Sequence, residues 1–230
     1  MVERAPWFVA FALGISLAVV ILLAGPLMLF NPLFVTALQQ RHAVAEAFGV
    51  PQYELDRVTT RMLIDIYTDG DFDAAFQAFS PLQAEPDSPL LNERERSHMH
   101  DVARLVRILG VSVLAAAIVA VLSARRMRGE SRRVGAVMLW TAGVIGAAAL
   151  ALAATFAVAF EAAFLAFHAV FFPPGTYVFE PGSNLIALFP EGFWFDASLV
   201  AGATILLSAI LCALAGYRLW RRGPQTPLPA

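Results

Sequence analysis

The sequence predicts an all-α integral membrane protein with four transmembrane helices and a mostly helical region outside the membrane. Of its 230 residues, 59% are hydrophobic and 15% are charged, which is too apolar for a soluble domain of this length. Four apolar stretches reach about 20 residues each, the helical length that crosses a bilayer core of about 30 Å. Inside lipid these stretches must be helical, because no other open structure satisfies its own backbone polar groups.

The four expected spans follow from the positions of these apolar stretches. They cover residues 7–30, 105–124, 134–160 and 197–219. In the first span, the Gly25-Pro26 step should kink or end the helix. The apolar core of that span is too long for a signal peptide and no cleavage motif follows it, so we expect residues 1–30 to form a retained anchor.

Arginine placement predicts which side of the membrane each segment faces. The short loop 125–133 holds five arginines, the flank 218–222 holds three, and Arg4 precedes the first span. Short arginine-rich segments stay in the cytoplasm. We therefore expect both termini and this loop to be cytoplasmic, with residues 31–104 and 161–196 outside. The tail 220–230 should be cytoplasmic and disordered.

The two outer segments differ in composition. In the longer one, helical patterns over residues 32–48 and 52–67 are followed by a proline-punctuated loop over residues 80–92. The outer segment 161–196 is aromatic and apolar, and it is interrupted by prolines and glycines. Such a segment cannot cross lipid, so we expect it to lie at the membrane interface or to cap a cavity.

Three of the four histidines fall at the outer ends of predicted spans. His98 and His100 precede the second span, and His168 follows the third. On a helix His98 and His100 point about 200° apart, so they cannot both face one site. His98 shares a face with Asp101, which can either fix the tautomer of the imidazole or cap the start of the helix. His42 lies in the first outer helical pattern, where we expect an ordinary surface residue.

His168 lies in a stretch rich in phenylalanine. Seven residues earlier, Glu161 lies on the same helical face, about 10 Å away along the axis. An ionisable residue at membrane depth is a functional candidate, because hydrocarbon offers it no partner. A buried histidine satisfied by a backbone carbonyl is the alternative.

Several common chemistries lack their motifs. There is no GxSxG nucleophile, no glycine-rich phosphate loop, and no basic aromatic patch for nucleic acid. The single cysteine, Cys212, excludes an internal disulfide and a CxxC metal site. A zinc site made of His98, His100, Asp101 and His168 is conceivable, but the spacing is not that of HExxH and the two close histidines diverge. We therefore expect neither a metal nor a cofactor.

Three motifs, ERERSHMHDV, FHAVFF and NLIALFPEGFWFD, follow one another in this order on a four-span chain. Together they resemble the bacterial lipoprotein intramolecular transacylases, over most of the chain. The resemblance implies an enzyme of the bacterial cytoplasmic (inner) membrane that acts on diacylglyceryl lipoproteins surrounded by membrane lipid. Such enzymes move the sn-2 acyl chain to the α-amine of the N-terminal cysteine, which gives the lyso form.

The same resemblance places the catalytic residues at His98 and His168, on the extracytoplasmic side. A neutral imidazole can take a proton from the α-amine, and a second imidazole can protonate the leaving oxygen or bind the oxyanion. We expect His168 to be the base, because its setting is the more apolar, and His98, held by Asp101, to be the acid. Glu161 and Asn184 would support the site, although many family members carry aspartate at the position of Asn184.

The aromatic cap would contact the acyl chains, or it would form an interfacial belt of the kind that many membrane proteins have. Its residues are Phe171, Phe172, Phe189, Phe193 and Trp194. Two other classes of function stay open at this point. One is a non-enzymatic membrane scaffold or assembly protein, and the other is a metal-dependent membrane hydrolase.

Overall fold

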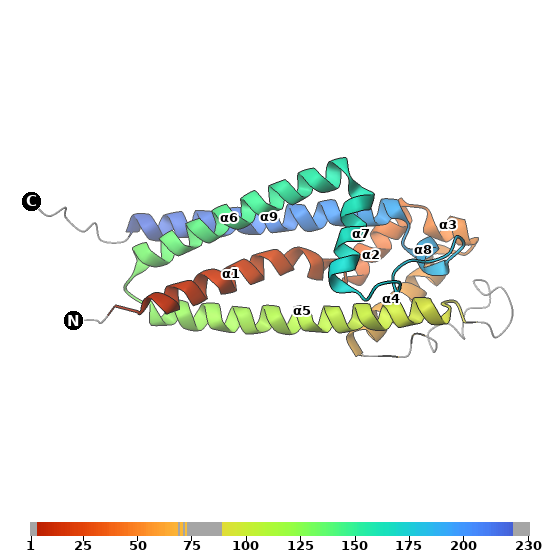
Figure 1. Cartoon of the computed structure of the whole chain (residues 1–230), viewed down its shortest axis with the longest axis horizontal. Helices are drawn as coiled ribbons and strands as arrows, with labels where there is room; N and C mark the ends of the chain where they lie inside the picture. Colours follow the sequence, from red (N-terminus) through yellow and green to blue (C-terminus); the bar gives the residue numbers. More distant parts are fainter. Residues whose placement is uncertain (1–3, 69, 71, 73–88, 223–230) are drawn as a thin grey trace, which may run out of the picture. The chain divides into compact units, whose positions relative to one another are not determined.

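The computed structural model describes residues 4–68, 70, 72 and 89–222, and the structural statements below concern those residues. All of its regular elements are helices (Figure 1). They are α1 (Trp7–Met28), α2 (Pro32–Arg41), α3 (Val44–Phe48), α4 (Gln52–Thr68), α5 (Glu93–Arg126), α6 (Ser131–Val158), α7 (Phe160–Phe171), α8 (Asn184–Leu188) and α9 (Glu191–Arg222). Most of the expected loop 80–92 and of the tail 220–230 lies outside the described residues.

The predicted membrane fold is confirmed. Helices α1, α5, α6 and α9 are each long and apolar enough to cross a membrane. Two of them begin earlier than their apolar stretches, since α5 starts at Glu93 and α9 at Glu191. The helix α1 runs through Pro26 and ends at Met28. His98 therefore lies on a helical turn that precedes the apolar part of α5.

The chain divides into two compact units, which are described separately. The span unit contains Met1–Pro26, Gly110–Ala154 and Ala201–Ala230, and the histidine unit contains Leu27–Leu109 and Thr155–Val200. Both expected outer segments fall in the histidine unit. The arginine-rich loop falls in the span unit, together with both ends of the chain.

Small side chains let the helices of the span unit pack closely. Ile21 of α1 meets Ala142 and Ile145 of α6 and Ala209 of α9 in one buried cluster. At Gly135 of α6, a Cβ atom would lie 2.5 Å from the carbonyl oxygen of Gly216 in α9. Such backbone approach through small residues is the usual way in which helices pack in lipid.

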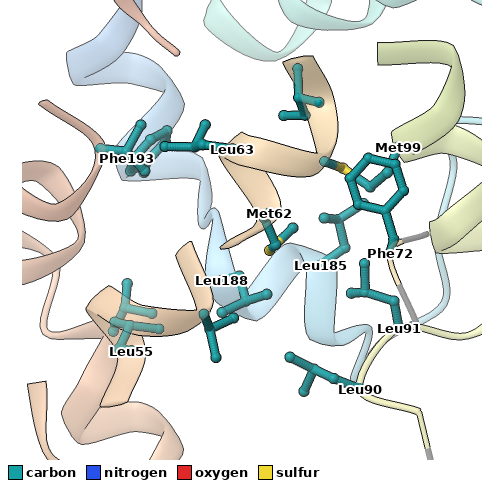
Figure 2. Packing of buried hydrophobic residues seen from close by; sticks show 14 of the residues in the cluster. Leu55, Met62, Leu63, Phe72, Leu90, Leu91, Met99, Leu185, Leu188 and Phe193 are labelled. Carbon is teal, nitrogen blue, oxygen red and sulfur yellow. The ribbon is translucent and has the colours of Figure 1, made fainter. Parts of the chain in front are cut away.

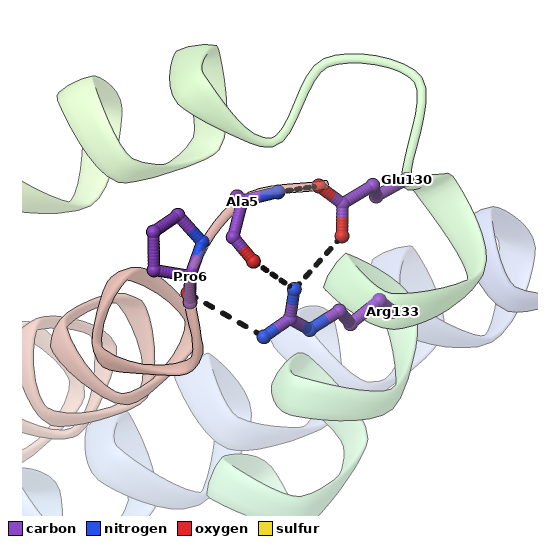
Figure 3. Close-up of polar contacts among 4 residues, drawn as sticks. All are labelled: Ala5, Pro6, Glu130 and Arg133. Atoms are coloured by element: carbon purple, nitrogen blue, oxygen red, sulfur yellow. Dashed lines mark hydrogen bonds and ion pairs between the residues drawn. The ribbon is translucent and has the colours of Figure 1, made fainter. Parts of the chain in front are cut away.

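Polar contacts join the N-terminal segment to the loop between α5 and α6 (Figure 3). The Ala5 N–H donates to Glu130 at 2.6 Å, and Arg133 donates to the Ala5 carbonyl at 2.6 Å and to Glu130 at 2.9 Å. The hydrogen bond from Ala5 and the one from Arg133 lower the pKa of Glu130. Beside them, the Arg132 guanidinium lies 5.1 Å from the centre of the Trp220 ring. The three arginine-bearing segments of the sequence thus meet within the span unit.

The histidine unit has its own hydrophobic core, to which α2, α3, α4, α5, α8 and α9 contribute. Figure 2 shows side chains of α4 and α8 directed toward one another, with Phe193 of α9 and Leu90 and Leu91 around them. Within this core the Gln39 amide accepts from the Thr59 hydroxyl and donates to the Leu188 carbonyl. The core therefore holds α8 and the first turns of α5 and α9.

His42 is not the plain surface residue that the sequence predicted. Helix α2 ends at Arg41 and α3 begins at Val44, and between them Ala43 has a left-handed backbone conformation with a φ of 52°. The His42 side chain is partly buried at this turn. Its Nε2 lies 3.0 Å from Asp196, which also receives Arg41 at 2.7 Å. A Cβ at position 192 would lie 2.7 Å from the ring, so Gly192 makes the contact possible. These contacts tie α2 to α9.

Candidate active site

Two of the predicted site residues, His98 of α5 and His168 of α7, lie ring against ring. Their ring centroids are 6.0 Å apart and the ring planes differ by 26°. His100, two residues along α5, is exposed and contacts the edge of Phe72. The helix that starts at Glu93 therefore sends the two neighbouring histidines to different faces, as their spacing predicted.

Aromatic rings surround this histidine pair. Phe172 and Phe179 contact His98, with centroid distances of 4.8 and 5.5 Å. His168 lies 4.2 Å from Phe164 and 5.4 Å from Tyr177, and Phe172 contacts it as well. Few polar groups remain near the two imidazoles, so the site favours their neutral forms.

The hydrogen-bonding states of the two rings differ. His168 Nδ1 lies 2.8 Å from the carbonyl oxygen of Phe164, so this nitrogen carries the proton and donates it. The Nε2 of His168 then keeps its lone pair and can accept a proton. His98 is 6% exposed, and its buried Nδ1 has no hydrogen-bond partner among the described residues. A buried polar atom without a partner is costly, so a ligand that bonds to it would relieve this cost.

Burial lowers the pKa of both histidines. The pKa of His98 falls to about 4, first because the ring is buried and second because His168 lies beside it. Burial also lowers the pKa of His168, although its hydrogen bond to the Phe164 carbonyl partly opposes this effect. His98 is the more deeply buried of the two.

Glu95 is a buried residue near the site that the sequence analysis missed. It precedes His98 by one helical turn and is 1% exposed. Its carboxylate accepts hydrogen bonds from the Ser183 hydroxyl, from the Leu185 N–H at 3.2 Å and from the Asn92 N–H at 2.8 Å. The Asn92 side chain in turn accepts from the Glu95 N–H, which completes a capping box at the start of α5. The N-x-x-E pattern at residues 92–95 could have predicted this capping box, but not the bonds to Ser183 and Leu185.

The three predicted supporting residues take different places. Asp101 lies 3.9 Å from Arg104, and the structure records no hydrogen bond between it and His98. Glu161 is exposed in the first turn of α7. Asn184 donates to the Leu90 carbonyl at 2.7 Å, which joins α8 to the segment before α5. The geometry thus gives Asn184 a structural contact and does not give Asp101 the orienting contact that was expected.

The predicted aromatic cap separates into two groups. Phe172 contacts both catalytic candidates, and Phe171 beside it is 47% exposed. Phe189, Phe193 and Trp194 pack into or against the hydrophobic core, where Phe193 is 2% exposed. Phe172 is therefore the member of the predicted cap that the structure records in contact with the histidine pair.

Potential metal ligands are not gathered in the described part of the chain. Within it, no group of three or more His, Cys, Asp or Glu side chains could hold a metal ion. His98 and His168 lie together, but His100 leaves α5 on another face, against Phe72, and Asp101 pairs with Arg104.

Comparisons with known proteins agree with this fold. The family model of the lipoprotein intramolecular transacylase Lit matches residues 9–194. An uncharacterized protein of Aquifex aeolicus (strain VF5) is 26% identical over 144 residues, which are 63% of this chain and 64% of that protein. The match therefore spans less than two thirds of that relative.

Solved structures with the same fold come from Bacillus cereus. The membrane integral lipoprotein intramolecular transacylase Lit of that organism matches with a TM-score of 0.77 and 17% identity, over 94% of this chain and 95% of that one. A variant of it in which alanine replaces a histidine matches with a TM-score of 0.70 and 18% identity, over 93% and 91%. Since the family model covers most of the sequence, this chain belongs to the lipoprotein intramolecular transacylase (Lit) family.

Proposed function

We propose that this protein moves the sn-2 acyl chain of a diacylglyceryl lipoprotein to the α-amine of its N-terminal cysteine. The observation that carries the proposal is the pair of stacked imidazoles, His98 and His168, in an aromatic enclosure. One ring has a free Nε2, and the other has a buried nitrogen without a partner. The substrate brings its own nucleophile and its own ester, so the protein needs to supply only proton transfer, oxyanion binding and positioning.

In the proposed reaction, His168 is the general base. Its Nε2 takes a proton from the amine as the amine nitrogen attacks the ester carbonyl. The tetrahedral intermediate then collapses, the bond from the carbonyl carbon to the glycerol oxygen breaks, and the glycerol oxygen receives the proton that His168 holds. No atom is gained or lost, since one ester becomes one amide and one free hydroxyl.

His98 is best suited to bind the oxyanion. Because its pKa is about 4, the ring is neutral at physiological pH and presents an N–H without a positive charge. A preorganised donor in a site that excludes water stabilises the charge that develops on the carbonyl oxygen. From the sequence we expected His98 to be the general acid, with Asp101 orienting its ring; we now propose that His98 binds the oxyanion instead.

The helix α7 would meet the acyl chains. It carries His168, none of its residues is buried, and Leu165, Val170 and Phe171 stand exposed along it. An apolar helix of 12 residues is too short to span a bilayer, but it can lie at the boundary of headgroups and acyl chains. A lipid ester held along α7 would then lie near the histidine pair.

We also propose that both termini and the loop 125–133 are cytoplasmic in the inner membrane, with the histidine pair on the outer side. The positive-inside rule supports this orientation. The contacts of Arg133 with Ala5 and of Arg132 with Trp220 support a common side for these three segments. A cysteine placed at position 128, in a Cys212→Ser background, should resist an impermeant thiol reagent in intact cells. Labelling of that cysteine from outside the cell would contradict the proposed orientation.

Conversion of lipoproteins in cells tests the proposed reaction directly. Expressed in a bacterium whose lipoproteins are diacylated with free amino termini, this protein should turn them into the lyso form. The mass of each N-terminal lipopeptide should stay constant, while fragmentation shows one chain on the glyceryl group and one on the amine. A mass increase of one acyl chain would instead indicate transfer from a phospholipid. Unchanged mass and unchanged fragments would contradict the proposed reaction and favour the non-enzymatic scaffold.

The pH dependence of kcat/KM should reveal the lowered pKa of the base. The substrate amine has a pKa of about 8, so its neutral fraction falls tenfold for each pH unit below that value. An ordinary imidazole would add a second tenfold factor below about pH 6.5. Because burial lowers the pKa of His168, the plot of log(kcat/KM) against pH should keep a slope of one through pH 6.5 and steepen at lower pH. A slope of two that sets in at pH 6.5 would contradict a buried base.

A further inference from the structure

A hollow with a largely polar lining lies at the start of α5, in the turns before His98. It has a volume of about 290 Å³, and its lining includes Asn92, Arg94, Glu95, Glu180, Ser183 and Asn184. These residues come from two places, the start of α5 and the loop that leads into α8. The proposed transfer step does not use this hollow.

Phe179 connects the hollow to the site. Phe179 is one of the residues that line the hollow, and its ring contacts His98 with a centroid distance of 5.5 Å. The loop that carries Phe179 is held in place, because the Arg94 guanidinium donates to the carbonyls of Gly175 and Val178 at 3.0 Å each. One residue, Phe179, therefore belongs both to the lining of the hollow and to the aromatic surroundings of His98.

The chemistry of the lining selects among possible occupants. Hydrogen-bonding side chains and backbone make it unfavourable for an acyl chain, which gains nothing by displacing water from polar groups. Its charged residues are Arg94, Glu95 and Glu180, so the formal charge is one negative unit and an anionic phosphate headgroup is not favoured. A neutral, extended peptide fits better, because its backbone N–H and C=O groups need partners of both kinds.

We infer that this hollow receives the first residues of the polypeptide that follow the lipidated cysteine. The inference rests on the proposed function, in which the amine of that cysteine reacts beside His98 and His168. The acyl chains leave the reacting centre along the apolar α7, and the peptide must leave it by another route. The polar hollow behind Phe179 provides that route and would align the amine with the ester.

Substrates of graded peptide length test the inference on the wild-type protein. Diacylglyceryl cysteine amide and the corresponding lipopeptides with one, two, three and four added serines are offered to the purified full-length protein. We expect kcat/KM to rise by about tenfold over the first added residues and then to level off, since one or two net hydrogen bonds correspond to such a factor. Equal kcat/KM for all lengths would overturn the inference while leaving the proposed reaction intact. No transfer with any of them would instead count against the proposed function.

A matched pair of variants locates the effect. Glu180 lines the hollow, is exposed, and makes no recorded side-chain contact with any residue that the structure describes. Glu180→Trp should narrow the hollow and bring the kcat/KM of the longest lipopeptide down to that of the shortest. Glu46→Trp places the same ring at an exposed position of α3 and should keep the tenfold rise. A rise that survives Glu180→Trp would show that the peptide binds elsewhere, and the length series remains decisive if this variant fails to fold.

Discussion

Alanine at either His98 or His168 is expected to lower the rate of acyl transfer by about 10²–10⁴-fold, because positioned acid–base groups contribute that much. In the proposed reaction, His168→Ala removes the Nε2 that would take the amine proton, and His98→Ala removes the donor that would bind the oxyanion. The measurement is single-turnover conversion of a diacylglyceryl lipopeptide by purified protein, followed by mass fragmentation. Both variants should be recovered from the membrane in wild-type amounts, because His98 Nδ1 has no hydrogen-bond partner among the described residues and His168 is only partly buried.

His100→Ala is the matched control. It removes the same kind of side chain two residues away on the same helix, from a face where the ring is exposed. We expect its rate to stay within about twofold of the wild type, since surface substitutions rarely matter. Loss of activity in His100→Ala equal to that in His98→Ala would mean that the substitutions disturb α5 and not the chemistry.

The variant that carries both His98→Ala and His168→Ala tests whether the two rings act in the same step. Two residues that act in one step lose activity together, so the combined loss should be much smaller than the product of the single losses. Multiplication of the two effects would indicate that the rings serve separate steps, and wild-type rates in both single variants would refute the mechanism.

The sequence was sufficient to predict the membrane fold, because apolar length and arginine position are local signals that need no tertiary information. It was also sufficient to predict that His98 and His100 diverge, since a helix starting before both fixes the angle between them. The positions of His98 and His168 at the ends of spans made them candidates for one site. Their stacking at 6.0 Å depends on how α7 packs against α5, which the sequence does not give.

Contacts between distant segments account for what was missed. Asp101 stands three residues from both His98 and Arg104, so spacing alone could not decide between them, and the structure records its contact with Arg104. His42 looked like a surface residue until Gly192, 150 positions later, was found to leave room for its ring beside Asp196. Glu95 carried a local capping signal, but its bonds to Ser183 and Leu185 join segments about 90 residues apart.

The second large effect is expected from replacing Glu95, which should lower both the stability of the protein and its rate of acyl transfer. Glu95→Ala should lower the free energy of unfolding of the histidine unit by roughly 3–5 kcal/mol. Three donors lose their acceptor together, namely the Ser183 hydroxyl and the N–H groups of Leu185 and Asn92. Each buried donor left without a partner costs about 1–3 kcal/mol. The measurement is thermal unfolding of the purified protein in detergent.

Comparison among three variants separates the carboxylate from the rest of the side chain. Glu95→Gln keeps an oxygen for Ser183 and Leu185 but turns an NH₂ group toward the Asn92 N–H, so its loss of stability should lie between those of Glu95→Ala and the wild type. Glu93→Ala removes an exposed carboxylate from the same first turn of α5 and should change stability by about 0.5 kcal/mol or less. Equal unfolding temperatures for Glu95→Ala and Glu93→Ala would show that the buried carboxylate does not hold the two segments together.

The same Glu95 variants test whether a loss of stability in the histidine unit also lowers the rate of acyl transfer. The bonds of Glu95 fix the start of α5, one turn before His98, to the segment that brings Phe179 against the His98 ring. Loosening that connection should lower kcat more than it raises KM. The two rings would lose their alignment with the transition state, while the exposed face of α7, which we propose as the contact for the acyl chains, would be unchanged. The loss of kcat in Glu95→Gln should therefore be partial and should follow its partial loss of stability. Full activity in a destabilised Glu95→Ala protein, assayed well below its unfolding temperature, would instead mean that the position of His98 is set by the aromatic enclosure alone.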